Sequence, residues 1–125
     1  MPVIGKLTRR RDGVTLLSRV VWCDSFGCRL RGLMFRRHLP ADEGLLLVED
    51  RTGRSSAAIH MLFMRFPIAA IWLDDGFRVV DAVHARPWRP VYVPSQAARY
   101  TLEANPDLLA TVEIGDELVF ERLED

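Results

Sequence analysis

Short apolar stretches, separated by glycine, proline and aspartate, run through most of the chain. This pattern predicts a mainly β protein, because strands are short and their turns need residues that tolerate unusual backbone angles. Asp12-Gly13 and Asp75-Gly76 have the composition of tight hairpin turns. The expected strands are residues 3–8, 14–22, 45–48, 57–64, 68–73, 77–83, 97–103 and 117–123. We expect residues 1–125 to form one domain, a compact β-sandwich or barrel of about eight short strands with one or two short helices.

Two segments depart from the strand pattern. Apolar side chains recur at helical spacing in residues 26–33. The two preceding residues, Asp24 and Ser25, can each cap the start of a helix. We expect residues 29–38 to be structural and to pack Leu30, Leu33 and Met34 against the sheet. Asn105-Pro106 resembles a helix cap followed by proline at the first helical position, which predicts a second short helix ending by residue 112.

Residues 45–48 form a continuous apolar run between two polar turns. A strand that faces solvent on one side alternates apolar and polar residues, whereas one covered on both sides does not. We therefore expect this strand to be buried on both faces.

Charge balance argues against a nucleic-acid partner. Lysine and arginine number 17, aspartate and glutamate also number 17, and the formal net charge is zero, whereas nucleic-acid binders usually carry a basic excess. No window approaches the ~18 consecutive apolar residues of a membrane span, and no signal-peptide pattern opens the chain. We expect a cytoplasmic protein without membrane or nucleic-acid partners. The basic residues 29–38 are interpreted as a solvated face in preference to an anion-binding one.

The two cysteines, Cys23 and Cys28, are expected to be free thiols. Four residues separate them, which is not the spacing of a redox pair, and no second pair of ligands completes a zinc site. Cytoplasmic proteins keep their thiols reduced. No cofactor is predicted.

Three separated stretches resemble one protein family. They read RLRGLMFR at residues 29–36, IHMLFMRFPI at residues 59–68 and VEIGDEL at residues 112–118. In this order they are similar to the opening, central and closing motifs of the domain of unknown function 192 family. The resemblance spans about residues 3–123 and implies a mainly β fold with no established activity. Ala69-Ala70 departs from the family, which often has an acidic residue after the Pro-Ile pair.

Candidate functional residues cluster around His60. On a strand, His60 and Met64 would share a face, but two donors do not make a metal site, which needs three or four. We expect His60 to be structural, hydrogen-bonded to backbone or carboxylate. No nucleophile motif or phosphate loop is present, so no catalytic residue is assigned.

The preferred hypothesis is a non-enzymatic binding or accessory module. Its candidate groove is lined by His60, Met64, Arg65, Trp72 and Trp88. The alternative is an enzyme of unrecognised chemistry that uses His60 with Arg65 or Asp74. An enzyme would bring at least one titratable pair together in a cleft.

A proline-rich stretch, residues 84–96, carries Trp88 and Tyr92 close to Arg86 and Arg89. One interpretation is a loop fixed to the domain by its own aromatic residues. The other is a flat apolar surface with cationic edges, which suits a protein, peptide or carbohydrate partner.

Overall fold

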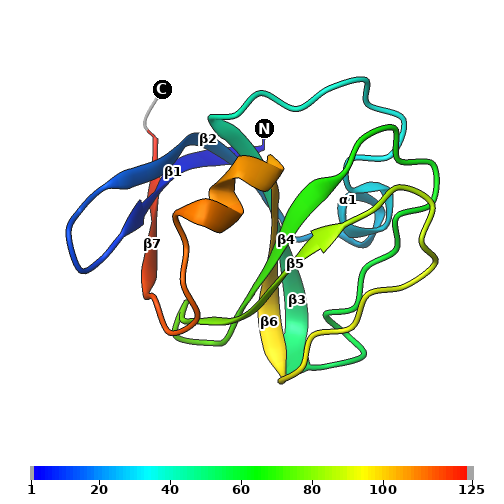
Figure 1. Cartoon of the computed structure of the whole chain (residues 1–125). Helices are drawn as coiled ribbons and strands as arrows, with labels where there is room; N and C mark the ends of the chain where they lie inside the picture. The colour runs from blue at the N-terminus through cyan, green and yellow to red at the C-terminus, as the bar shows by residue number, and fades with distance from the viewer. Residues whose placement is uncertain (1, 124–125) are drawn as a thin grey trace.

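Seven strands form one mixed sheet within residues 2–123, the part of the chain described by the computed structural model (Figure 1). The sheet order is β5-β4-β6-β3-β2-β1-β7, and only β2 and β3 pair in parallel. The strands are β1 (Val3–Arg9), β2 (Thr15–Cys23), β3 (Glu43–Gly53), β4 (Ile68–Leu73), β5 (Val79–Ala85), β6 (Ala98–Ala104) and β7 (Leu118–Arg122). One α-helix, α1 (Phe26–Arg31), and one 3-10 helix, η1 (Pro106–Ala110), accompany them. The mainly β class is confirmed.

The sheet curls until its two edge strands come close at one end. An isolated bridge between Arg78 and Glu117 joins the segments that lead into β5 and β7. Backbone hydrogen bonds from Val79 to Asp116 and from Leu118 to Phe77 flank this bridge. Among the described residues β5 and β7 form no continuous ladder, so the sheet is not closed into a barrel. β1 and β2 form the first predicted hairpin, and β4 and β5 form the second.

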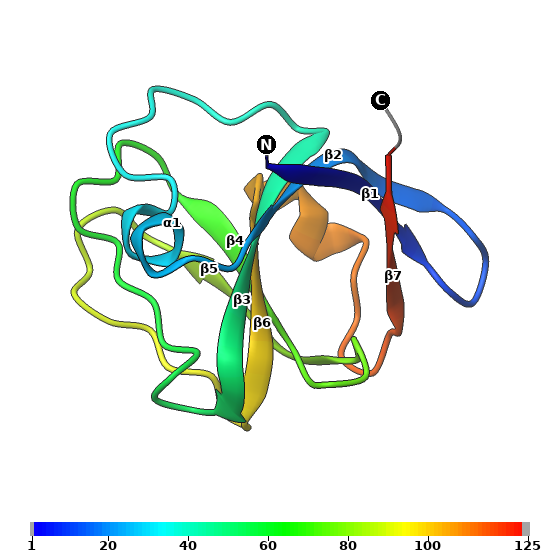
Figure 2. The ribbon, with the colours of Figure 1, turned by 180° about the vertical axis from the view of Figure 1, so that it is seen from behind.

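Strands β4 and β6 and the first half of β3 are buried on both faces. Leu46 on β3 and Leu102 on β6 belong to a core inside the curl, where η1 adds Leu108. Leu45 and Leu47 point the other way, into a second core beneath α1 and the loops. Figures 1 and 2 show α1 and η1 on opposite sides of β3 and β6. The predicted two-sided burial of residues 45–48 is confirmed.

The predicted strand over residues 57–64 is wrong. These residues form a loop in which only Ile59 makes a bridge, to Tyr92 in the proline-rich stretch. Its first half buries alternate residues, as a strand does. The chain then turns at Phe63, whose φ of 61° is incompatible with a strand. Hydrogen bonds join Met61 to Arg89 and Trp88, so one loop pairs with another.

The helix α1 begins where expected, because the Ser25 hydroxyl accepts a hydrogen bond from the Cys28 N–H at 3.2 Å. It ends at Gly32, whose φ is 50°. Leu33 is buried after this turn, as predicted, but Leu30 is 56% exposed, so its expected packing against the sheet is wrong. A helix of six residues is too short to present a full apolar stripe to the sheet.

The expectation of two free thiols is also wrong, because Cys23 and Cys28 form a disulfide. The first turn of α1 folds back over the end of β2 and brings the two Cα atoms to 5.7 Å. This separation lies within the range that a disulfide spans. The prediction of free thiols was based on the expected cytoplasmic location. It did not take into account that the turn at residues 24–27 brings the two cysteines together.

Replacing Leu33 with alanine is expected to lower the free energy of unfolding by about 2–5 kcal/mol, because a cavity would remain beneath α1. Leu30→Ala is the matched control, since the exposed Leu30 should change stability by less than about 0.5 kcal/mol. Denaturant unfolding measures both. Equal midpoints for the two variants would contradict the assignment.

Thiol titration in denaturant without reductant is expected to detect no reactive cysteine, and two after reduction. Because the disulfide closes a short loop, its reduction should lower the free energy of unfolding by about 2 kcal/mol. Two reactive thiols in freshly purified, unreduced protein would show that the bond is not formed.

Candidate functional site

A pocket of about 240 Å³ lies between α1, strands β3 and β6, and the loop of residues 58–64. Its walls are mainly apolar, with Leu33 and Met34 after the helix, Leu47 from β3, and Ile59 and Met64 from the loop. The pocket sits on the face of the sheet that the second core occupies. It is therefore a gap in the cover that α1 and the loops place over the central strands.

Glu103 provides the carboxyl group of this pocket. It lies on β6 between Leu45 of β3 and Ala70 of β4 and is only 5% exposed. A Cβ atom at Gly32 would lie 3.2 Å from Glu103 Oε1, so the carboxyl group reaches up beneath the turn after α1. Within the described residues this carboxyl group has no recorded hydrogen bond or ion pair. It faces the pocket instead.

Burial raises the pKa of Glu103 from 4.5 to about 7. The cause is desolvation alone, since water is largely excluded and no cation lies near enough to offset the loss. At neutral pH the group is therefore divided between carboxylic acid and carboxylate. It can donate a hydrogen bond in one form and accept hydrogen bonds in both.

The sequence interpretation placed Glu103 at the end of a strand and gave it no role. One signal was available: Glu103 follows Tyr100-Thr101-Leu102 in a strand that pairs with the apolar run of β3. A carboxyl group in a sheet covered on both faces needs a partner, a shifted pKa or a cavity. The sequence does not show which residues cover Glu103, because those residues are distant from it along the chain.

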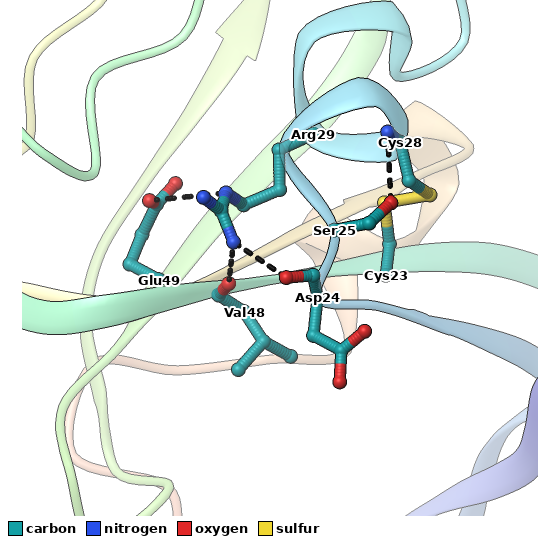
Figure 3. The surroundings of a disulfide bond; sticks show 7 residues. All are labelled: Cys23, Asp24, Ser25, Cys28, Arg29, Val48 and Glu49. Carbon is teal, nitrogen blue, oxygen red and sulfur yellow. Dashed lines mark hydrogen bonds and ion pairs between the residues drawn. A yellow bond between two sulfur atoms is a disulfide. The ribbon is translucent and has the colours of Figure 1, made fainter.

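The guanidinium of Arg29 holds α1 on the edge of the pocket (Figure 3). Its Nη1 donates to the Asp24 carbonyl at 2.6 Å and to the Val48 carbonyl at 3.1 Å. Its Nε lies 3.5 Å from Glu49 Oε2. Burial raises the pKa of Glu49, and the charge of Arg29 opposes this shift. Arg29 is thus engaged with the protein's own groups.

His60 lies at the rim of the pocket with both ring nitrogens engaged by backbone groups. Nδ1 accepts a hydrogen bond from the Leu62 N–H at 3.2 Å, and Nε2 lies 3.3 Å from the Leu30 carbonyl. The imidazole therefore bridges the loop of residues 58–64 to α1. Backbone partners were expected for His60, although the ring is half-buried and not fully enclosed, and its structural role stays a prediction.

The residues proposed for the groove from sequence are divided between three places. His60 and Met64 line the pocket. Arg65 and Trp88 line a neighbouring hollow, which Met64 also borders. Trp72 is fully buried and donates its indole N–H to the Ala57 carbonyl at 2.8 Å, so it lines neither.

Asp74, the alternative partner of His60, lies in the turn between β4 and β5. Its carboxylate accepts hydrogen bonds from the backbone N–H groups of Gly76 and Arg78. No recorded interaction joins it to His60 among residues 2–123. Over the same residues no group of three or more His, Cys, Asp or Glu side chains is placed to hold a metal ion, and no helix is long and apolar enough to cross a membrane.

Two solved structures share this fold. A putative transcription regulator from Sinorhizobium meliloti superposes with a TM-score of 0.82 at 22% identity, over 96% of this chain and 94% of that one. A protein of unknown function from Novosphingobium aromaticivorans superposes with a TM-score of 0.77 at 21% identity, over 94% of this chain and 84% of that one. At these identities the likeness establishes the fold alone.

Curated relatives are uncharacterised UPF0127 proteins. The Thermococcus kodakarensis protein is 40% identical over 97 residues, which are 78% of this chain but only 60% of that protein's length. The Pyrococcus furiosus protein is 35% identical over 89% of this chain and 94% of its own length. Residues 7–120 match the uncharacterized ACR family, domain of unknown function 192. The chain belongs to this family, as the three sequence motifs indicated.

Proposed function

We propose that the chain is a binding module for a small ligand with an apolar body and a hydrogen-bonding, preferably cationic, head group. The observation that carries the proposal is the buried carboxyl group of Glu103, which faces the pocket without a partner among the described residues. A ligand that hydrogen-bonds to this group compensates the desolvation that burial imposes on it.

The dimensions and lining of the pocket define the size of the ligand. A cavity of about 240 Å³ exceeds the roughly 150 Å³ needed to hold a benzene-sized molecule. Leu33, Leu47 and Met64 offer an apolar wall to such a body. Glu103 then contacts the head group at the sheet, and α1 covers the ligand from above.

A cationic head group is favoured over an anionic one. Ionised Glu103 attracts an ammonium or amidinium group, whereas Glu49 on the pocket wall is paired with Arg29 and adds no free charge. Arg29, the cation on the same wall, is engaged by Glu49 and two carbonyl groups. Binding of a cation also favours the ionised form of Glu103 and thus releases a proton near neutral pH.

Catalysis is the second candidate, because a carboxyl group whose pKa is about 7 is matched to general acid–base chemistry at neutral pH. Binding is preferred since the recorded partners of His60 are backbone groups. The cytoplasmic location remains a proposal, and the Cys23–Cys28 disulfide removes the support that reduced thiols would have given it.

Benzylamine is a suitable probe of the proposed function, with benzyl alcohol as its uncharged counterpart. Amide NMR shifts should concentrate at Leu33, Leu47 and Glu103. Glu103→Gln should weaken benzylamine binding by about 10- to 100-fold and affect the alcohol much less, because a charge-assisted bond is lost. Glu113→Gln, at an exposed carboxylate outside the pocket, is the matched control. Absence of shifts at the pocket with the amine would overturn the proposal.

The pH dependence of stability provides a test that needs no ligand. The pKa of Glu103 is about 7 in the fold, against 4.5 ordinarily, so the folded state binds the extra proton between these values. The resulting stabilisation is fully present below pH 4.5 and is lost as pH rises through 7, to a total of about 3 kcal/mol. Unfolding of Glu103→Gln should lack this decline. Parallel pH profiles for the variant and the wild type would contradict the shifted pKa.

A further inference from the structure

Three exposed aromatic residues gather beside the pocket. Phe35, Phe63 and Trp88 are 55%, 46% and 58% exposed, although each is large and apolar. The Phe63 ring centroid lies 5.3 Å from that of Phe35 and 5.0 Å from that of Trp88. With Met64, Arg65 and Pro87 they line a shallow cavity of about 510 Å³, here called the aromatic hollow.

Each of these aromatic residues occupies a strained backbone conformation. The φ angles are 68° at Phe35, 61° at Phe63 and 70° at Trp88. Among residues 2–123 only Phe77 is a further non-glycine residue with positive φ. Positive φ is unfavourable for bulky residues and tends to persist where function requires a particular display of side chains. Since the three side chains are exposed, burial in a core does not account for their placement.

The loops that carry the aromatic hollow are basic and contain no carboxylate. Residues 31–41, 51–67 and 86–97 include no aspartate or glutamate but several arginines, of which Arg65 lines the hollow itself. Arg36, Arg37, Arg65, Arg86 and Arg89 are exposed. None of these five takes part in an ion pair recorded among the described residues. The net charge of the whole chain is zero, so these three segments carry a local excess of positive charge.

Tyr92 and Trp88 play different parts in the proline-rich stretch. The Tyr92 hydroxyl oxygen accepts a hydrogen bond from the Arg86 backbone N–H at 2.8 Å, and its ring lies 4.9 Å beneath the Arg89 guanidinium. Tyr92 therefore fixes the loop to the domain. Trp88, on the same loop, remains outside and is the part available to a partner.

We propose that the aromatic hollow is the docking site for an acidic peptide segment of a partner protein. One apolar side chain of the peptide enters between Phe35, Phe63 and Trp88, and carboxylates on either side of it pair with Arg65 and Arg89. Aromatic anchors in a hollow with cationic edges supply both parts of such an interface, apolar burial at the centre and charge complementarity at the rim.

The geometry favours a peptide over two other anionic partners. A hollow accommodates a single projecting side chain, whereas a lipid surface is best met by a convex apolar projection. Single-stranded nucleic acid needs free ring faces on which its bases stack. The Phe63 ring is tilted by 33° against Phe35 and by 60° against Trp88, so the three rings form a cluster and not a row of parallel stacking platforms.

The test uses the whole chain and two synthetic peptide pools. Each peptide has a central leucine, phenylalanine or tryptophan flanked by either aspartate and glutamate or lysine, with serine and glycine elsewhere. NMR should show shifts at Phe35, Phe63 and the Trp88 indole with the acidic pool only. A Trp88→Ala variant should bind at least tenfold more weakly, and Arg65→Gln should bind more weakly and respond less to salt.

Matched variants distinguish binding at the aromatic hollow from binding elsewhere on the chain. Ile114→Ala removes another exposed apolar side chain, 61% exposed and outside the hollow, and should bind as the wild type does. Glu103→Gln should also bind the peptides normally, so failure here is distinguishable from failure of the small-ligand proposal. The NMR spectrum of each variant reports whether it remains folded.

Three outcomes would overturn the proposal. One is that the acidic and the lysine-containing pools bind equally well, or that neither pool binds. Another is unchanged affinity in a folded Trp88→Ala variant. The third is preferential binding to phosphatidylglycerol vesicles or to a single-stranded oligonucleotide, either of which assigns the surface to a different class of partner.

Discussion

Burial of the central strands on both faces is the constraint on which the rest of the structure depends. The curl of the sheet encloses one face of β3, β4 and β6, and α1 with the long loops covers the other. A polar side chain in the central part of these strands, such as Glu103, is therefore largely removed from water, whereas Asp50 and Arg51 near the end of β3 are exposed. Glu103 is accommodated only because the cover leaves a pocket above it. The shifted pKa and the proposed ligand site follow from that single opening.

The cover is held by a small set of local interactions. Ser25 caps α1, Arg29 ties it to the backbone of β3, and the disulfide joins it to the end of β2 (Figure 3). The helix has no buried residue of its own, so tertiary packing contributes little to its position. A helix of this length would not be stable in isolation. Its attachment points therefore determine the shape of the pocket roof.

Features set by neighbouring residues were predictable from the sequence, and features set by distant contacts were not. Asp12-Gly13 and the run ending at Val48 predicted a hairpin and a doubly covered strand, because turn chemistry and burial pattern are local. Residues 57–64 have a strand's alternation, yet their hydrogen bonds go to another loop. The pocket at Glu103 could not be predicted, because its walls come from α1 and the loop of residues 58–64, which are distant in sequence from β6. The proline-rich stretch indicated Trp88 as a candidate contact surface, but Phe35 and Phe63 were missed, since the members of the aromatic hollow come from three loops.

Met64 borders both the pocket and the aromatic hollow, so the two proposed sites share a wall. A ligand that displaces this flexible side chain from one side changes the shape presented on the other. Thermodynamic linkage requires such an effect to be reciprocal: each occupant alters the affinity of the other by the same factor. Under the two proposals, a peptide at the surface and a small molecule at the sheet would act as mutual effectors through the Met64 side chain.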